Sequence, residues 1–205
     1  MTVTVAAFDV DGTVTDRDCV VPFMRRVAGT PRVASRLALR PDRLMAAAIR
    51  RDRDQLKALA AAAAFRGQFQ VDLLDAGHRF GQYVFDNWLR PDTIRRLDAH
   101  RAAGDRVVLV SASFDLYLRP LGRLLGVDDV LATRLKVRNG RMTGALDGAN
   151  CRGPEKVRRL HDWLAAEHGG RSHVRVVAYG DSAGDREMLA DADEARWVTP
   201  GGAAA

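Results

Sequence analysis

The chain has 205 residues, of which 47% are hydrophobic, and its formal net charge is +6. This length fits one medium domain, or a core domain that carries a small insertion. The longest purely apolar run, Ala58 to Phe65, is far shorter than the roughly 20 residues that span a bilayer, and two cysteines exclude a disulfide framework.

The first predicted element is a strand. Val3 to Phe8 form a nearly continuous apolar run, which is typical of a central strand covered on both faces. The first ten residues lack the basic start of a signal peptide. We therefore expect a cytoplasmic protein, with peripheral contact with a membrane as an alternative.

A helical insertion follows, and it is rich in Ala, Leu and Arg. Hydrophobic residues at three- and four-residue spacing predict two amphipathic helices broken near Pro41, and a third helix from Val71 to Val84. We expect residues 17–88 to form a small α-helical cap.

Positive charge is concentrated in this insertion. From Arg17 to Arg66 there are twelve Arg or Lys residues against four Asp, so the segment carries +8. Few aromatic residues lie among the arginines, and nucleic acid is therefore not an expected partner. Two interpretations stay open: a solvated helical face, or attraction to an anionic partner, either a phosphorylated substrate or an anionic lipid surface in weak contact. The arginines considered for lipid contact are Arg25, Arg26, Arg36, Arg40, Arg50 and Arg51.

Strands and helices alternate in the rest of the chain. The predicted helices are Pro91 to Ala102, Leu116 to Leu125, Pro154 to Glu167 and Asp185 to Ala190; the predicted strands are Val107 to Val110, Val130 to Ala132, Val174 to Tyr179 and Trp197 to Val198. Asn139-Gly140 joins two further short strands in a predicted β-hairpin. This alternation indicates an α/β fold, a Rossmann-like parallel sheet with helices on both faces, formed by residues 1–16 and 89–205.

Polar side chains follow the predicted strands at the points where ligands gather in an open parallel sheet. Asp9 and Asp11 come after the first strand, and Ser111 comes after Val107 to Val110. Asp181 and Asp185 follow the strand that ends at Tyr179, and Lys156 stands in the first turn of a helix. We expect these residues to lie close together.

These residue types are the ones that phosphoryl transfer requires. One carboxylate of the Asp9 and Asp11 pair can attack phosphorus, and the other can protonate the leaving oxygen. Asp181 can join Asp9 in holding Mg²⁺. Ser111, Lys156 and backbone N–H groups, assigned to Gly12 and Ala112, can bind the phosphate oxygens. Taken singly, each residue is as readily a turn former, a helix cap or a solvated side chain.

The motifs resemble those of the haloacid dehalogenase superfamily of phosphohydrolases. They are DVDGT from Asp9 to Thr13, Ser111 after VVLV, Lys156, and GDSAGD from Gly180 to Asp185. The position of the helical insertion resembles the phosphoserine-phosphatase-like branch, subfamily IB. The resemblance implies Asp9 as nucleophile and Asp11 as general acid and base, with Mg²⁺ held by Asp9, Asp181 and the backbone carbonyl of Asp11. It also implies phosphate contacts from Ser111 and Lys156, and support from Asp185.

The resemblance leaves the substrate open. Asp18 stands near the place of a glutamate that helps phosphoserine phosphatases to hold their substrate, but Gly184 stands where they have asparagine, and a counterpart of their arginine-bearing helix is not found. Asn150 and Arg152, near Lys156, are further candidates for substrate contact. We expect a Mg²⁺-dependent phosphatase for a small phosphorylated metabolite such as phosphoserine. The alternatives are a phospholipid head-group phosphatase, a phosphotransferase or phosphomutase, and a phosphorylation-switched receiver-like module. The sequence predicts no oligomeric state.

Overall fold

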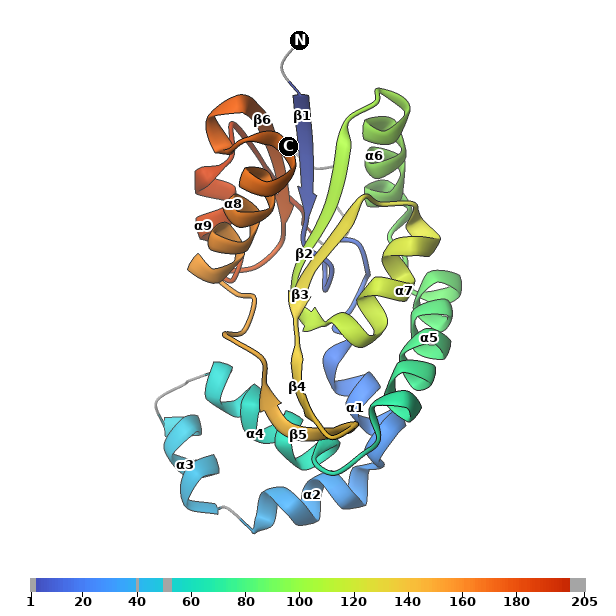
Figure 1. Ribbon diagram of the computed structural model, residues 1–205, viewed down its shortest axis with the longest axis vertical. Helices are drawn as coiled ribbons and strands as arrows, with labels where there is room; N and C mark the ends of the chain where they lie inside the picture. Colours follow the sequence, from blue (N-terminus) through green and yellow to red (C-terminus); the bar gives the residue numbers. More distant parts are fainter. Residues whose placement is uncertain (1–2, 40, 50–52, 200–205) are drawn as a thin grey trace.

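The computed structural model describes residues 3–39, 41–49 and 53–199, and its centre is a parallel β-sheet (Figure 1). The strand order is β3-β2-β1-β6-β7, and every neighbouring pair is parallel. The strands are β1 (Val3–Phe8), β2 (Arg106–Phe114), β3 (Asp129–Thr133), β6 (Val174–Gly180) and β7 (Glu194–Trp197). The predicted α/β fold class is confirmed.

Alternating side chains of β1 face two different hydrophobic layers, as the two-residue period of a strand requires. Ala6 and Phe8 point into one buried cluster, whereas Val5 and Ala7 point into another. The first layer is covered by α6 (Pro91–Ala102) and α7 (Asp115–Leu125), and the second by α8 (Pro154–His168) and α9 (Arg186–Asp191). A short 3₁₀ turn, Arg171–His173, precedes β6. The apolar run at the start of the chain is therefore a central strand, as predicted.

The insertion contains more helices than the sequence predicted. Before its last helix it has α1 (Val20–Ala28), α2 (Thr30–Ala38), α3 (Pro41–Ile49) and α4 (Arg53–Phe65), where two helices were expected. The predicted break near Pro41 is confirmed, because α3 begins there. A further break falls at Gly29, whose φ of 72° lies in the left-handed region that glycine adopts readily. A helical hydrophobic period on both sides of this glycine concealed the break.

The last helix of the insertion, α5 (Gln70–Asn87), packs very closely on α7 of the sheet domain. A Cβ atom on Gly77 would lie 2.2 Å from the carbonyl oxygen of Leu116, and one on Gly81 would lie 2.9 Å from that of Tyr117. The two glycines are four residues apart and therefore share one helix face. The absence of side chains at this face allows the two backbones to approach.

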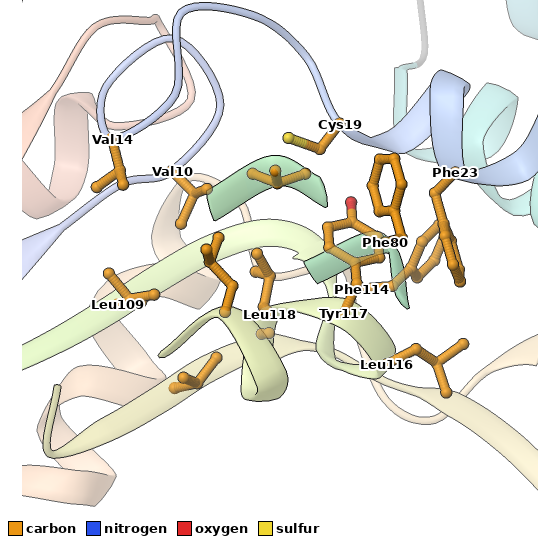
Figure 2. Packing of buried hydrophobic residues seen from close by; sticks show 14 of the residues in the cluster. Val10, Val14, Cys19, Phe23, Phe80, Leu109, Phe114, Leu116, Tyr117 and Leu118 are labelled. Carbon is orange, nitrogen blue, oxygen red and sulfur yellow. The ribbon is translucent and has the colours of Figure 1, made fainter. Parts of the chain in front are cut away.

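An aromatic cluster joins the insertion to the sheet domain (Figure 2). The ring of Phe23 in α1 lies 4.8 Å from Tyr117 and 5.3 Å from Phe80 of α5, measured between centroids. Phe65 of α4 meets Phe114 edge-on at 5.2 Å. Rings at such distances gain from their packing geometry as well as from burial. The insertion and the sheet domain thus share one hydrophobic core.

The predicted hairpin is present and leaves the main sheet. It consists of β4 (Leu135–Arg138) and β5 (Arg141–Leu146), joined by Asn139 and Gly140, which both have positive φ. The N–H of Gly67 donates to the carbonyl of Met142 at 2.8 Å, so the hairpin lies beside the end of α4 (Figure 1). The hairpin therefore contacts the insertion although it belongs to a distant part of the sequence.

The insertion leaves and re-enters the sheet domain at adjacent points. The N–H of Asp16 donates to the carbonyl of Trp88 at 2.9 Å, and that of Arg90 donates to the carbonyl of Val14 at 2.9 Å. The two ends of the insertion are thus tied together directly after β1. Among the described residues, none of the helices has the length and apolar character needed to cross a membrane.

Candidate active site

The end of β1 places Asp9 and Asp11 at the carboxyl edge of the sheet. The N–H of Asp9 still pairs with the carbonyl of Tyr179 in β6, at 2.9 Å, and the chain then turns back through hydrogen bonds to the carbonyl of Val10. Gly12 has φ of 87°, and a Cβ atom there would lie 2.2 Å from Oδ2 of Asp181. Glycine therefore permits both the turn and the close approach of the Asp181 carboxylate.

Lys156 is the centre of a buried charge cluster. It stands in the first turn of α8 with a residue exposure of 1%. Its Nζ donates to Oδ1 of Asp9 at 2.5 Å and to Oδ1 of Asp185 at 2.6 Å. Asp185 precedes α9, but its carboxylate accepts hydrogen bonds from Lys156 and Ser182 instead of capping that helix. The sequence motifs around Asp9, Lys156 and Asp185 thus meet at one point.

Three carboxylates surround a space that suits a divalent cation. One oxygen each of Asp9, Asp181 and Asp185 lies within 4.8 Å of the others. Thr13 supports the second of these residues, because its Oγ1 donates to Oδ1 of Asp181 at 3.4 Å. An all-oxygen donor set of this kind matches the preference of Mg²⁺, and a cation would offset the repulsion between the acids. The residues therefore fit the ion that the family resemblance implies.

Burial and like charges shape the acidity of this cluster. Burial raises the pKa of Asp9 to about 7, although the positive charge of Lys156 acts to lower it. The negative charges of Asp185 and Asp11 raise the pKa further. Burial likewise raises the pKa of Asp181. For Lys156 burial acts downward, but the carboxylates of Asp9 and Asp185 outweigh it and raise its pKa. The site thus holds a charged lysine between Asp9, whose pKa is raised, and Asp185, whose pKa is lowered because Lys156 outweighs the opposing effect of burial.

Asp11 is held in place by groups from two other segments. Its Oδ1 accepts a hydrogen bond from the backbone N–H of Cys19 at 2.9 Å, and its Oδ2 accepts one from the hydroxyl of Ser113. The hydroxyl of Tyr117 in turn donates to Oγ of Ser113 at 2.7 Å. Burial raises the pKa of Asp11, and repulsion from Asp18 acts in the same direction. A raised pKa suits a carboxyl group that must give a proton to a leaving oxygen.

Ser111 lies inside β2 and not directly after it, because the strand extends to Phe114. The pairing of β2 with β3 shifts its register between Ser111 and Phe114, so the segment is irregular where the site lies. Oγ of Ser111 accepts a hydrogen bond from the N–H of Ser113 at 3.1 Å. The sequence pointed to Ser111 but gave no role to Ser113, although its position two residues later on the same segment was a readable signal.

These side chains line one cavity of about 320 Å³. It is lined by Asp9, Asp11, Gly12, Asp18, Ser111, Ala112, Arg152, Lys156, Asp181, Ser182, Gly184 and Asp185. The site residues of the four motifs named in the sequence thus share one cavity, together with Gly12 and Ala112. Its chemistry combines carboxylates, a hydroxyl and cations, the set that binding of a phosphate and a metal ion needs.

A second cavity, of about 340 Å³, adjoins the first and shares Asp11, Asp18, Ala112 and Arg152 with it. Its remaining wall is mostly apolar and comes from α1 and α4, with Val20, Val21, Met24, Leu56 and Ala60. Asp18 is exposed, and its Oδ1 accepts the N–H of Val21 at 3.1 Å. Asn150 also lines this cavity, but its amide is engaged by Lys57, Thr133 and Asp54.

Lys57 is a residue of this region that sequence reasoning missed. It extends from α4 and donates to Oδ1 of Asn150 at 2.6 Å and to the carbonyl oxygen of Ala112. In the sequence it is an ordinary lysine in an alanine-rich helix. Its partners are 55 and 93 positions away, so no local spacing points to them.

Comparison with known proteins identifies the family of this chain. Residues 6–190 match the model of the haloacid dehalogenase-like hydrolase family. The chain belongs to this family. It is therefore an enzyme, a hydrolase of the haloacid dehalogenase superfamily, as the sequence predicted, and proteins named phosphatases are among its relatives.

Three relatives show how far the similarity extends. Protein CicA of Caulobacter vibrioides is 39% identical over 190 residues, which are 92% of this chain and 82% of that protein. Phosphoserine phosphatase of Archaeoglobus fulgidus is 36% identical over 89 residues, or 43% of this chain and 25% of that protein. The crystal structure of a Bordetella pertussis protein of unknown function has a TM-score of 0.73 at 27% identity, covering 93% of this chain and 87% of that one.

Proposed function

We propose that this protein is a Mg²⁺-dependent phosphomonoesterase that forms a phosphoryl intermediate on Asp9. The observation that carries the proposal is the buried contact of Lys156 with both Asp9 and Asp185, in the wall of a cavity that Asp11 and Ser111 also line. A buried lysine among carboxylates is costly as a purely structural device. It is well suited to a site that must hold a dianionic phosphate beside a carboxylate nucleophile.

The first step transfers the phosphoryl group to the enzyme. Lys156 occupies Oδ1 of Asp9, so Oδ2 is the oxygen we expect to attack phosphorus. The bond between phosphorus and the ester oxygen breaks, and Asp11 gives its proton to that oxygen so that it leaves as an alcohol. Ser111 and Lys156 bind the non-bridging oxygens during the transfer.

The second step regenerates the enzyme. Asp11, now ionised, takes a proton from a water molecule while that water attacks phosphorus. The bond between phosphorus and Asp9 breaks, and inorganic phosphate leaves. Ser113 and the N–H of Cys19 hold Asp11 in one orientation, so the same carboxyl group can act in both steps.

Asp9, Asp181 and Asp185, with the backbone carbonyl of Asp11, would hold the metal ion. When bound, Mg²⁺ would neutralise the charge that accumulates as a carboxylate approaches a phosphate dianion. This assignment gives Asp185 a direct place beside the metal as well as its contact with Lys156.

The substrate we favour is a small phosphorylated metabolite, with phosphoserine among the candidates. We further propose that residues 17–88 act as a cap over a core formed by residues 1–16 and 89–205, and that the second cavity receives the leaving alcohol. Asp18 and Arg152 line both cavities, and they offer a negative and a positive charge to polar groups of the alcohol. Transfer of the phosphoryl group to an acceptor other than water is compatible with the same residues, and added alcohol acceptors would reveal it.

A phospholipid head group is a second candidate substrate, because the insertion displays apolar side chains. Leu39, Met45 and Ile49 are 76%, 62% and 77% exposed, and the wall of the second cavity is also mostly apolar. Of the arginines considered for lipid contact, Arg40, Arg50 and Arg51 lie outside the described residues. A receiver-like module is not proposed, because the chain belongs to a hydrolase family and β2 carries Ser111 where such modules carry an acceptor aspartate.

Asp9→Asn tests the proposal. The amide keeps the shape of the carboxylate but is a far poorer nucleophile, so hydrolysis of p-nitrophenyl phosphate with Mg²⁺ should fall at least about a thousandfold. Asp72→Asn, the same change on the exposed surface of α5, should leave turnover within about twofold of the wild type. Substantial turnover by Asp9→Asn would remove Asp9 from the role of nucleophile.

A further inference from the structure

Lys57 brings a partly buried cation from the insertion to the segment that contains Ser111 and Ala112. Its Nζ donates to the carbonyl oxygen of Ala112, to Oδ1 of Asn150 at 2.6 Å and to Oγ1 of Thr133 at 3.4 Å. The ammonium group also lies 4.7 Å from the centroid of the Phe114 ring, where the negative face of an aromatic ring attracts it. The side chain of Lys57 thus helps to anchor α4 on the sheet domain.

The partners of Lys57 are mostly neutral, which makes its burial expensive. Burial lowers the pKa of Lys57 to about 8, partly offset by the charges of Asp11 and Asp54. Taking a charged group out of water costs free energy that neutral hydrogen-bond partners offset only in part. The contacts that this lysine makes therefore point to a role besides holding the fold together.

The carbonyl of Ala112 belongs to the peptide group between Ala112 and Ser113, and the N–H of that group contacts a residue of the site. The N–H of the same unit belongs to Ser113 and donates to Oγ of Ser111 at 3.1 Å. This hydrogen bond occupies a lone pair of the Ser111 hydroxyl and leaves its proton for a phosphate oxygen. The side chain of Ser113 meanwhile donates to Asp11. A peptide plane is rigid, so a cation on its carbonyl fixes both the N–H and the residues attached to it.

Asn150 completes the attachment of α4. Its Oδ1 accepts from Lys57 and, at 2.8 Å, from Oγ1 of Thr133, while its Nδ2 donates to Oδ1 of Asp54 at 2.7 Å. Asp54 and Lys57 are three residues apart, and therefore neighbours on one face of α4. The side-chain amide of Asn150 thus bonds to both Lys57 and Asp54 of α4.

We propose that Lys57 is a positioning residue, which orients the Ala112–Ser113 peptide and through it Ser111 and Asp11, so that the phosphate site is complete only when α4 is docked. This inference rests on the proposed phosphatase function. It assigns to the insertion a part in binding the phosphate itself, in addition to the choice of leaving group.

The test compares Lys57→Met with Lys136→Met. Methionine keeps most of the length of lysine and removes its charge, and Lys136 lies exposed on β4. We would measure the Kd of inorganic phosphate with Mg²⁺ by calorimetry, kcat and KM for p-nitrophenyl phosphate, and the melting temperature. We expect Lys57→Met to weaken phosphate binding about tenfold and to lower kcat/KM by a similar or larger factor, the effect of a misplaced hydrogen-bond donor. Lys136→Met should change neither the Kd of phosphate nor kcat/KM by more than about twofold.

Asn150→Ala provides an independent variant and a double-mutant cycle. If Lys57 acts through this attachment, the two substitutions should not be additive. The loss of phosphate-binding free energy in the double variant should be smaller than the sum of the losses in the two single variants. Should Lys57→Met not fold, Asn150→Ala alone should still weaken phosphate binding several-fold. A lower melting temperature with unchanged Kd and kcat/KM in these variants would show a purely structural role and overturn the inference.

The calorimetric measurement separates the two proposals. Wild-type protein that binds phosphate but releases none from any ester would refute the phosphatase function, and the Kd of Lys57→Met would still decide the role of Lys57. Wild-type protein that binds no phosphate would overturn both.

Discussion

The surroundings of Asp9 act on its pKa in opposite directions, and their net effect raises it to about 7. Burial and the neighbouring acids favour its protonated form, whereas Lys156 favours the ionised form. A nucleophile must be ionised, and so must a metal ligand. Metal binding and removal of a proton should therefore be coupled at this residue.

The coupling predicts how Mg²⁺ should stabilise the protein at different pH. The pKa of Asp9 is raised from 3.8 to about 7, so the folded state holds a proton that the unfolded chain has lost, and this contribution to stability disappears as pH rises through about 7. Mg²⁺ must displace that proton at low pH but not at high pH. The rise in melting temperature caused by Mg²⁺ should thus be larger at about pH 8 than at about pH 5.5.

Asp9→Asn is the control for this experiment, because an amide has no proton to lose in this range. In that variant the effect of Mg²⁺ should be smaller and should depend less on pH. A Mg²⁺ effect in the wild type that is equal at both pH values would contradict the coupling.

Most of the site residues that the sequence revealed stand at the ends of strands or the starts of helices. Asp9, Lys156 and Asp185 could be found because strand ends and helix starts converge in a parallel sheet, a rule that needs only the order of elements. Lys57 could not be found in this way. Its contacts depend on how α4 packs against a segment far away in the sequence, and nothing in the local pattern encodes that packing.

At the scale of elements, the contact between α5 and α7 depends on the absence of side chains. Gly77→Ala would place a methyl group 2.2 Å from the carbonyl oxygen of Leu116, closer than atoms can approach. We expect this variant to lose about 1–3 kcal/mol of stability as the helices move apart. The measurement is the free energy of unfolding from urea titration.

The sign of this effect is informative, because Gly to Ala in an unobstructed helix stabilises by roughly 0.5–1 kcal/mol. Asp72→Ala, at an exposed position of the same helix, should change stability by no more than about 0.5 kcal/mol. A stabilised Gly77→Ala protein would show that the two helices are not in close contact.

The sequence predicted the elements of the sheet domain better than those of the insertion, and the reason is physical. α6 spans Pro91–Ala102 as predicted, because proline begins it and Gly104 follows its end. β2 was predicted to end at Val110 but extends four residues further, into the irregular segment of the site. In the insertion, alanine and arginine favour helix nearly everywhere, so the boundaries depend on tertiary packing.

For the whole molecule, the insertion combines exposed apolar side chains with the chain's excess of positive charge. A segment with both properties is suited to contact with an anionic membrane. We expect the protein to sediment with vesicles containing phosphatidylglycerol at low salt, less at moderate salt, and not with vesicles of phosphatidylcholine alone.

Ile49→Asp distinguishes this binding from non-specific attraction. It places a negative charge on the exposed surface of α3 and should weaken sedimentation several-fold, whereas Val71→Asp on α5, at a position 69% exposed, should have a much smaller effect. If the wild type stays in solution with anionic vesicles at low salt, the basic residues form a solvated face only.

The backbone groups of Asp16 and Trp88 are paired where the polypeptide leaves and rejoins the sheet domain, so the proposed cap, residues 17–88, begins and ends at adjacent points. Such a piece can be exchanged between related proteins without a change in the direction of β1. The aromatic rings at the contact limit such an exchange. Phe23 and Phe80 pack against Tyr117 of α7, so a transplanted insertion must be accompanied by its matching α7 surface. Chimaeras that keep this surface and the insertion together should fold, and those that separate them should aggregate.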